Sequence, residues 1–233
     1  MTAMTAMALP PRRVVIFDVG GVVAESPIVA IRLFCQQRQL ADLNRFLFSS
    51  SAWHRLERAQ MAFRDFPEAA LKECQERGVQ DGINLGLEGW RELLQIIRGV
   101  ANLRPVMLQA IQRLRQHGFV VAALTNNFAE AKDPSAAAAL ARFRSLFDHF
   151  IESSASKMRK PETGFYQLAL DTIGCKAHEA IFLDDIGKNL KPAAAMGIHT
   201  ILVENNHPEQ YLEALEKLQG LVNLQLTDLA AKL

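Results

Sequence analysis

The chain has 233 residues, of which 49% are hydrophobic and 22% charged, and its formal net charge is +1. This length suits one large domain, or a core with a smaller insert, with ample apolar surface to bury. Near-neutral charge with interspersed signs argues against an electrostatic nucleic-acid or anionic-membrane binder. Charges interrupt each apolar stretch before it reaches membrane-spanning length, so we expect neither nucleic acid nor a membrane as partner.

The cysteines and histidines form no recognisable disulfide or metal-binding pattern. Cys35, Cys74 and Cys175 lie far apart, and the six histidines are scattered. Such cysteine usage fits a reducing compartment, so we expect a cytoplasmic protein. Residues 1–12 lack the apolar core of a secretory signal, and we expect a disordered tail there. The alternative is an organelle transit peptide, because this segment is free of acidic residues and ends in arginine.

The rest of the chain alternates between apolar strands and amphipathic helices. Residues 13–17 form a short β-branched apolar run followed by a glycine turn, which is typical of a buried strand. Residues 28–100 have helical spacing throughout, and a proline and a glycine flank a helix expected over 64–78. Four further strands are expected at 119–127, 149–152, 179–185 and 198–204. The later helices are expected at 102–118, 135–141, 141–148, 161–174, 186–197 and 208–219.

This alternation predicts an α/β fold with a doubly wound parallel sheet and helices on both of its faces. The helical stretch between the first and second strands is far too long for one crossover connection. We therefore expect it to be an inserted helical domain. The predicted division is a Rossmann-like core made of residues 13–25 and 101–233, with the helical insert over 26–100.

Polar side chains follow three of the expected strands at the point where each strand ends. Open α/β sheets bind ligands outside the carboxyl ends of their strands, so these side chains should meet in one crevice. Lys160, which precedes an expected helix, is a further candidate. The strand-end residues are Asp18, Thr125, Asn126, Asn127, Asp184 and Asp185.

Each candidate alone has an ordinary structural interpretation. A single aspartate after a strand is commonly a cap or turn residue, asparagines commonly form turns, and a lone lysine is commonly solvated. The neighbouring carboxylates of Asp184 and Asp185 are harder to explain, because they repel each other and resist burial unless a cation lies between them. The combination at matching strand ends is more specific than any one member.

These residue types suit phosphoryl transfer. The Asp18 carboxylate can attack phosphorus and form an aspartyl-phosphate, which divides one difficult step into two easier ones. Mg²⁺ held by Asp18 and Asp185, together with the charge of Lys160, would offset the repulsion between carboxylate and phosphate. The Thr125 hydroxyl and the Asn126 amide can hold phosphoryl oxygens. Hard oxygen ligands without His or Cys favour Mg²⁺ over zinc or copper.

The segments "FDVGG", "LTNN", "RKPE" and "FLDDIGKNLKPA" match, in order, the four motifs of the haloacid dehalogenase (HAD) superfamily, which the chain resembles from about residue 13 to 220. It is particularly similar to the subgroup that contains the N-terminal phosphatase domain of soluble epoxide hydrolase and the glucose-1-phosphatase-type members. The HAD domains of certain acyl-CoA dehydrogenases look similar too. The resemblance implies a HAD-type Rossmann-like core, with the insert as a cap over the substrate.

The resemblance also implies a role for each metal-site residue. Asp18 would be the nucleophile and a magnesium ligand, and Asp185 the second carboxylate on the metal. Asp184 would be a weaker ligand or would lie just outside the coordination sphere. Gly20 matches the position whose backbone carbonyl binds the metal.

On the substrate side, Thr125 and Asn126 would bind phosphate, and Lys160 would stabilise both nucleophile and phosphate. Substrate specificity would come from the cap. The candidates there are Arg58, His54 and Glu57, for which a solvated helix face is an equally good interpretation.

Gly20 departs from the phosphatase pattern, in which an aspartate at this position acts as general acid and base. Such help is worth about 10²–10⁴ in rate. Three explanations stay open: a substrate with a good leaving group, such as a sugar-1-phosphate or acyl phosphate; a proton from Glu25 or a cap residue; or binding without efficient turnover. The leading hypothesis is a magnesium-dependent phosphatase of a small phosphorylated metabolite. The alternatives are a catalytically weak phosphate-binding or regulatory protein and, with less support, a dehalogenase.

Overall fold

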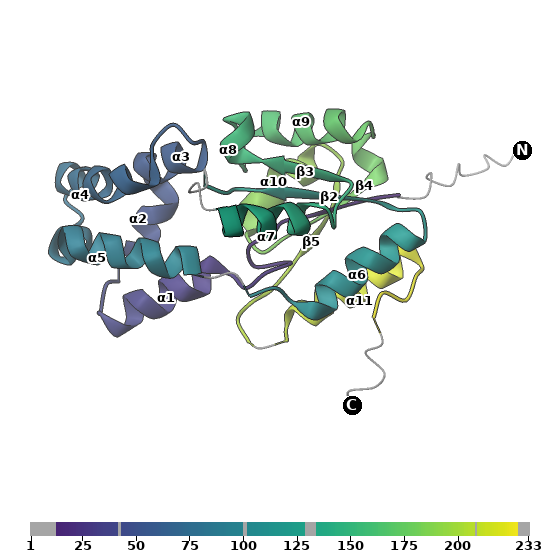
Figure 1. Ribbon diagram of the computed structural model, residues 1–233, viewed down its shortest axis with the longest axis horizontal. Coiled ribbons are helices and arrows are strands. Elements are labelled where there is room, and N and C mark those ends of the chain that lie inside the picture. Colours follow the sequence, from purple (N-terminus) through teal and green to yellow (C-terminus); the bar gives the residue numbers. More distant parts are fainter. Residues whose placement is uncertain (1–12, 42, 100–101, 129–133, 208, 228–233) are drawn as a thin grey trace, which may run out of the picture.

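The computed structural model of the chain describes residues 13–41, 43–99, 102–128, 134–207 and 209–227 (Figure 1). The tail predicted over 1–12 lies outside the described residues, and so does the predicted boundary at residues 100 and 101. Within the described part of the chain, no helix is long and apolar enough to span a membrane.

The core is a five-stranded parallel sheet with the strand order β3-β2-β1-β4-β5. It confirms the doubly wound α/β fold and all five expected strands. β1 is central, and its last residue, Phe17, pairs with Ala123 on one side and Leu183 on the other. Asp18 therefore leaves the sheet between the carboxyl ends of β2 and β4. The strands are β1 (Val14–Phe17), β2 (Val120–Thr125), β3 (His149–Glu152), β4 (Ala180–Asp184) and β5 (His199–Leu202).

Helices cover both faces of the sheet. Alternate side chains of each strand point to opposite faces, and each face carries an apolar cluster that the helices bury. In β1, Val15 and Phe17 belong to the core beneath α6 and α11, whereas Val14 and Ile16 belong to the core beneath α9 and α10 (Figure 1). Both faces are apolar, which explains why β1 reads as a continuous hydrophobic run. The covering helices are α6 (Pro105–Gln116), α11 (Tyr211–Val222), α9 (Thr163–Ile173) and α10 (Gly187–Ala195).

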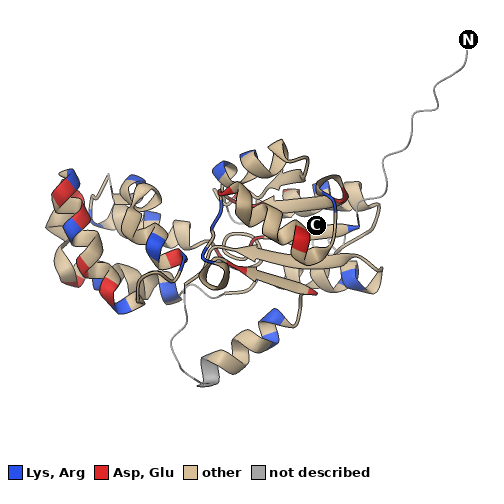
Figure 2. Ribbon diagram, turned by 90° about the horizontal axis from the view of Figure 1, so that it is seen from above, with Lys and Arg blue, Asp and Glu red and all other residues tan. Residues whose placement is uncertain are grey.

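The segment between β1 and β2 folds around a separate hydrophobic cluster beyond one end of the sheet (Figure 1). Trp90 is at its centre, in edge contact with Phe46 and Phe66. Figure 2 shows acidic and basic residues close together along these helices. The elements are α1 (Pro27–Gln37), α2 (Leu43–Ser49), α3 (Ser51–Glu57), η1 (Phe63–Asp65), α4 (Phe66–Arg77) and α5 (Gln80–Gly99), which is interrupted at Gly86.

The helices differ from the sequence prediction mainly at their ends. The helix expected over 141–148 ends earlier, since α7 is Pro134–Arg144. Asp148 instead binds strand β2: its backbone N–H donates to the Val121 carbonyl, and its carboxylate accepts from the Val121 N–H. α9 begins two residues after Pro161 and α11 three residues after 208. Two short elements were not predicted, α8 (Ser153–Ser156) and η2 (Ala177–Glu179).

Candidate active site

Asp18 is fixed in a buried position at the carboxyl end of β1. Its backbone N–H donates to Leu183 O at 2.8 Å, which extends the sheet pairing by one residue. Its side-chain Oδ1 accepts from the Val19 N–H at 2.7 Å and lies 2.8 Å from Lys160 Nζ. Burial raises the pKa of Asp18 well above its usual value; Lys160 opposes this shift, and the neighbouring aspartates add to it.

Lys160 is a fully buried cation between two carboxylates. Its Nζ lies 2.8 Å from Asp18 Oδ1 and 2.7 Å from Asp184 Oδ2. Burial alone lowers the pKa of a lysine, but the two carboxylates outweigh it, so the pKa of Lys160 is raised. Asn126 holds the Lys160 backbone, since its Oδ1 accepts from the Lys160 N–H at 2.9 Å and its Nδ2 donates to Lys160 O at 3.1 Å.

Asp184 is fully buried, and donors surround both of its oxygens. Oδ1 accepts from the Ile186 N–H at 2.8 Å and from Asn189 Nδ2 at 3.0 Å. Oδ2 accepts from Lys160 and from the same Asn189 amide, at 3.1 Å. These contacts make Asp184 the counter-ion of Lys160 and an anchor for the start of α10.

Among the residues that the structure describes, Asp185 is held through one of its two oxygens. Its Oδ2 accepts from Ser26 Oγ at 2.8 Å and from Asn205 Nδ2 at 3.2 Å. Burial, and next the charge of Asp184, raise the pKa of Asp185 to about 6. Carboxylate oxygens of Asp18, Asp184 and Asp185 all lie within 4.8 Å of one another. A divalent cation fits this donor set, because one lysine does not neutralise three carboxylates held so close together.

The two glycines after β1 have different surroundings. Gly21 has a φ of 81°, and a Cβ on it would lie 2.0 Å from Asp185 Oδ2. Only glycine therefore lets the carboxylate rest against this loop. Gly20 lacks a positive φ, and a Cβ there would lie 3.1 Å from the Pro27 ring, a tight but adjustable contact.

The metal-free protein is expected to lose free energy of unfolding as pH rises from 3.8, the ordinary value for aspartate, to about 6. In this window the folded state keeps the Asp185 proton more firmly than the unfolded state does, so raising the pH favours unfolding. Asp185→Asn should flatten this part of the profile. Urea unfolding in EDTA at several pH values measures it, with the exposed Asp171→Asn as control. A profile that is identical in wild type and Asp185→Asn would show that Asp185 does not titrate in this way.

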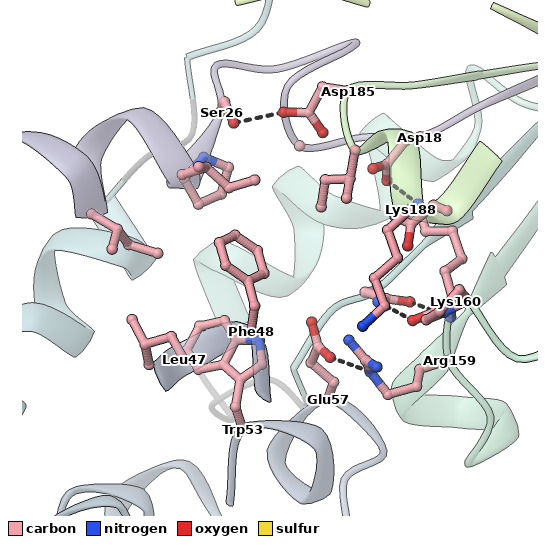
Figure 3. A pocket seen from close by; sticks show the side chains of 18 of the residues that line it. Asp18, Ser26, Leu47, Phe48, Trp53, Glu57, Arg159, Lys160, Asp185 and Lys188 are labelled. Carbon is pink, nitrogen blue, oxygen red and sulfur yellow. Dashed lines mark hydrogen bonds and ion pairs between the residues drawn. The ribbon is translucent and has the colours of Figure 1, made fainter. Parts of the chain in front are cut away.

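The acidic cluster opens into a cavity of about 470 Å³ between the sheet edge and the helical segment (Figure 3). Charged side chains from the core lie on one side, and Leu47, Phe48 and Trp53 from the helical segment face them (Figure 3). The charged and polar wall residues are Asp18, Ser26, Glu57, Asn126, Arg159, Lys160, Asp185, Lys188 and Asn189. The apolar wall residues include Ile28, Ile31, Leu47, Phe48, Trp53, Ile97, Phe128 and Ile186.

An ion pair joins the helical segment to the core at this cavity. Glu57, at the end of α3, accepts from Arg159 Nε at 2.5 Å, and both side chains are largely buried. Ser153 Oγ also donates to the Glu57 carbonyl at 2.7 Å. Burial raises the pKa of Glu57, and Arg159 opposes that shift.

The predicted substrate-binding residues differ in their surroundings. The Arg58 guanidinium pairs with Glu162 and donates to the His54 carbonyl. Thr125 is buried at the end of β2. In the described part of the chain, neither Arg58, His54 nor Thr125 belongs to the cavity wall, whereas Glu57 and Asn126 do. Glu57, the last residue of α3, lines the cavity, whereas Arg58, which follows it, is paired with Glu162.

Several residues at the site were not predicted. Arg159 and Asn189 lie inside the segments "RKPE" and "FLDDIGKNLKPA", so their place in these motifs was a usable signal. Lys188 lies in the same segment and contributes a further cation to the wall. Ser26 and Asn205 carried no motif signal.

The family of the chain follows from comparison with known proteins. The family model described as haloacid dehalogenase-like hydrolase matches residues 12–197, and the chain belongs to this family of hydrolases. The structure is similar to a HAD-family enzyme of Bacteroides thetaiotaomicron solved with magnesium and inorganic phosphate. That likeness has a TM-score of 0.57 and 17% identity, and covers 86% of this chain and 98% of the other.

The chain is also similar to three curated proteins. It is 35% identical to acyl-CoA dehydrogenase family member 10 of mouse, over 89% of this chain and 19% of that protein. It is 32% identical to bifunctional epoxide hydrolase 2 of rat, over 89% and 39% respectively, which confirms the subgroup resemblance. It is 30% identical to a sesquiterpene phosphatase of Aspergillus oryzae, over 78% and 85%. The chain thus spans well under half of the first two relatives.

Proposed function

We propose that the protein is a magnesium-dependent phosphohydrolase that forms an aspartyl-phosphate on Asp18. The observation that carries this proposal is the buried Lys160 ammonium, which joins Asp18 to Asp184 while Asp185 faces the same space. A structural salt bridge would need one carboxylate. Three carboxylates and one lysine suit a site where a cation and a phosphoryl group are to be bound together.

The roles of the residues follow from these contacts. The Val19 N–H and Lys160 hold Asp18 Oδ1, which orients the carboxylate for attack. Attack forms a bond from a carboxylate oxygen to phosphorus and breaks the bond to the leaving oxygen, and water then hydrolyses the acyl phosphate. Asp18, Asp185 and the Gly20 carbonyl would hold Mg²⁺. When bound, the ion supplies charge stabilisation to the phosphoryl oxygens.

The phosphate side is assigned to the polar end of the cavity. Lys160 would pair with the phosphoryl oxygens and with Asp18. We assign to Asn126 mainly the role of fixing the Lys160 backbone. The direct contacts of Thr125 and Asn126 with phosphate, which the sequence predicts, remain part of this proposal. Asp184 is assigned to Lys160 and not to the metal, because donors already surround both of its oxygens.

The rest of the cavity favours a substrate with an apolar body. Leu47, Phe48, Trp53 and Phe128 form a wall opposite the acidic cluster, and pockets of this kind bind hydrocarbon or rings. The similarity to a sesquiterpene phosphatase supports a small phosphate ester of an apolar alcohol. In this proposal residues 26–100 are the cap, and residues 13–25 and 101–233 are the catalytic core.

The proposal is tested by magnesium-dependent release of phosphate from two alkyl monophosphates, an isoprenoid or long-chain ester and glycerol phosphate. We expect release in Mg²⁺ and none in EDTA, with kcat/KM rising as apolar carbons are added, because each buried CH₂ is worth about 0.8 kcal/mol. Phe48→Ala should raise KM for the apolar ester only. Leu33→Ala removes an exposed leucine outside this cavity and is the control. If neither ester nor an aryl phosphate released phosphate, the proposal would be contradicted.

Introducing the missing general acid is expected to raise kcat/KM for substrates that have poor leaving groups. Glu25, considered as a substitute, is exposed and accepts from Asn102 at 3.0 Å, away from the cavity. Gly20→Asp should raise kcat/KM for alkyl phosphates relative to aryl phosphates by up to about 10²–10⁴. The side chain is tolerated if the Pro27 ring shifts by a few tenths of an ångström.

The test compares Gly20→Asp with wild type in one quantity, the kcat/KM for the alkyl phosphate divided by the kcat/KM for the aryl phosphate. Gly21→Ala is the matched control, since its Cβ would overlap the Asp185 carboxylate and should lower activity on both substrates. An unchanged ratio in a folded Gly20→Asp protein would mean that another group already transfers this proton.

A further inference from the structure

A side chain outside the four motifs connects the glycine loop to the carboxylate of Asp185. Asn205 lies three residues beyond the end of β5, at the same edge of the sheet as the acidic cluster. Its Nδ2 donates to Gly21 O at 2.9 Å and to Asp185 Oδ2 at 3.2 Å. One amide group thus joins the segments that follow β1, β4 and β5.

Arg104 determines which way the Asn205 amide faces. Its Nη2 donates to Asn205 Oδ1 at 2.7 Å, and its Nη1 donates to the carbonyls of Gly21 at 2.8 Å and Val22 at 3.2 Å. The guanidinium also stacks on Tyr211, 4.2 Å from the ring centre. Arginine can only donate, so the amide oxygen must face Arg104 and the NH₂ group must face Gly21 and Asp185.

We infer that Asn205, oriented by Arg104, is a positioning residue for the metal-binding carboxylate. Together with Ser26 it occupies Asp185 Oδ2, which leaves Oδ1 for the ion. Its second bond, to Gly21 O, holds the loop that carries Gly20 at a fixed spacing from this carboxylate. This inference rests on the proposed function, since it assigns Asp185 to Mg²⁺.

The close approach at Gly21 shows why the spacing matters. The Asp185 carboxylate lies where a Cβ of residue 21 would be, so loop and carboxylate are in direct contact. Two ligand groups on separate segments bind an ion well only if their separation is held before the ion arrives. Partners of this kind, behind the ligands themselves, commonly change metal affinity 10- to 100-fold when removed.

The test is the dissociation constant of Mg²⁺, measured by calorimetry without substrate. Asn205→Ala should weaken binding about 10- to 100-fold. Asn206→Ala should leave it unchanged, because Asn206 is the exposed neighbour in the same loop and its side chain lies outside this network. At saturating Mg²⁺ the kcat of Asn205→Ala should approach that of wild type, whereas a loop that is merely disordered would lower kcat at all concentrations.

Thermal melts in EDTA verify that the variants fold. If Asn205→Ala does not fold, Asn205→Ser replaces it, because a serine is too short to bridge both acceptors and should weaken binding in the same way. Wild type and Asn205 variants with equal Mg²⁺ affinity would overturn the inference and leave the proposed function standing. A wild type that neither binds Mg²⁺ nor hydrolyses phosphate esters would instead remove the proposed function.

Discussion

Replacing Asp18 with asparagine is expected to abolish turnover, by a factor of about 10³ or more, because the amide cannot attack phosphorus. The fold should remain. Asparagine has nearly the same volume, its oxygen can still accept from the Val19 N–H, and Lys160 keeps its partner Asp184. The melting temperature in EDTA should equal or exceed that of wild type, since burial and the neighbouring aspartates already disfavour a charge on Asp18.

The measurement is phosphate release under saturating Mg²⁺, with a thermal melt of the same sample. Asp171→Asn makes the same chemical change on the exposed surface of α9 and should be as active as wild type. An Asp18→Asn protein with wild-type activity would exclude the covalent mechanism.

Lys160→Met is expected to destabilise the fold as well as inactivate the enzyme. Removing one member of a buried ion pair typically costs about 3–5 kcal/mol, because the remaining charge stays buried without a partner. Here two carboxylates, Asp18 and Asp184, would be left facing each other. The pKa of Asp18 in the folded state, already raised by burial, would rise further without the opposing charge of Lys160, so the folded state would bind more protons than the unfolded one. The lost stability should therefore be largest in alkaline buffer and should shrink as the pH falls.

Urea unfolding in mildly acidic and mildly alkaline buffers measures both the loss and its pH dependence. The control is Lys157→Met, which removes an exposed lysine from the same loop and should change stability little. A Lys160→Met protein as stable as wild type at alkaline pH would mean that Lys160 does not neutralise these carboxylates.

The sheet and the centre of the site could be predicted from sequence because both depend on local patterns. Apolar runs predicted the strands. The rule that ligands bind at strand carboxyl ends predicted that Asp18 and Asp185 lie close together. The same rule applied to β5 would have singled out Asn205, which lies just beyond that strand. Lys160 precedes a helix and does not follow a strand. Its charge was counted among the candidates for this crevice, but its place between Asp18 and Asp184 was not predicted, because these contacts join distant segments.

The cavity wall could not be predicted in the same way. Ile31 and Leu47 pack in the core of the helical segment and also line the cavity. Their hydrophobic spacing predicts that they are buried, but it does not distinguish core packing from a cavity wall. Glu57 is the last residue of α3 and Arg58 follows it, and which of the two faces the cavity depends on how that helix docks on Arg159 and Ser153. Such contacts between distant segments leave no periodic signal in the chain.

In the proposed mechanism the phosphoryl group is bonded covalently to Asp18 before water releases it. Acid quenching during turnover, followed by borohydride reduction and peptide mass spectrometry, measures this directly, since reduction converts an acyl phosphate into an alcohol. We expect the reduced product at Asp18 in wild type with Mg²⁺, and no such product in Asp18→Asn. Rapid phosphate release with no product at Asp18, or with the product on another aspartate, would contradict it.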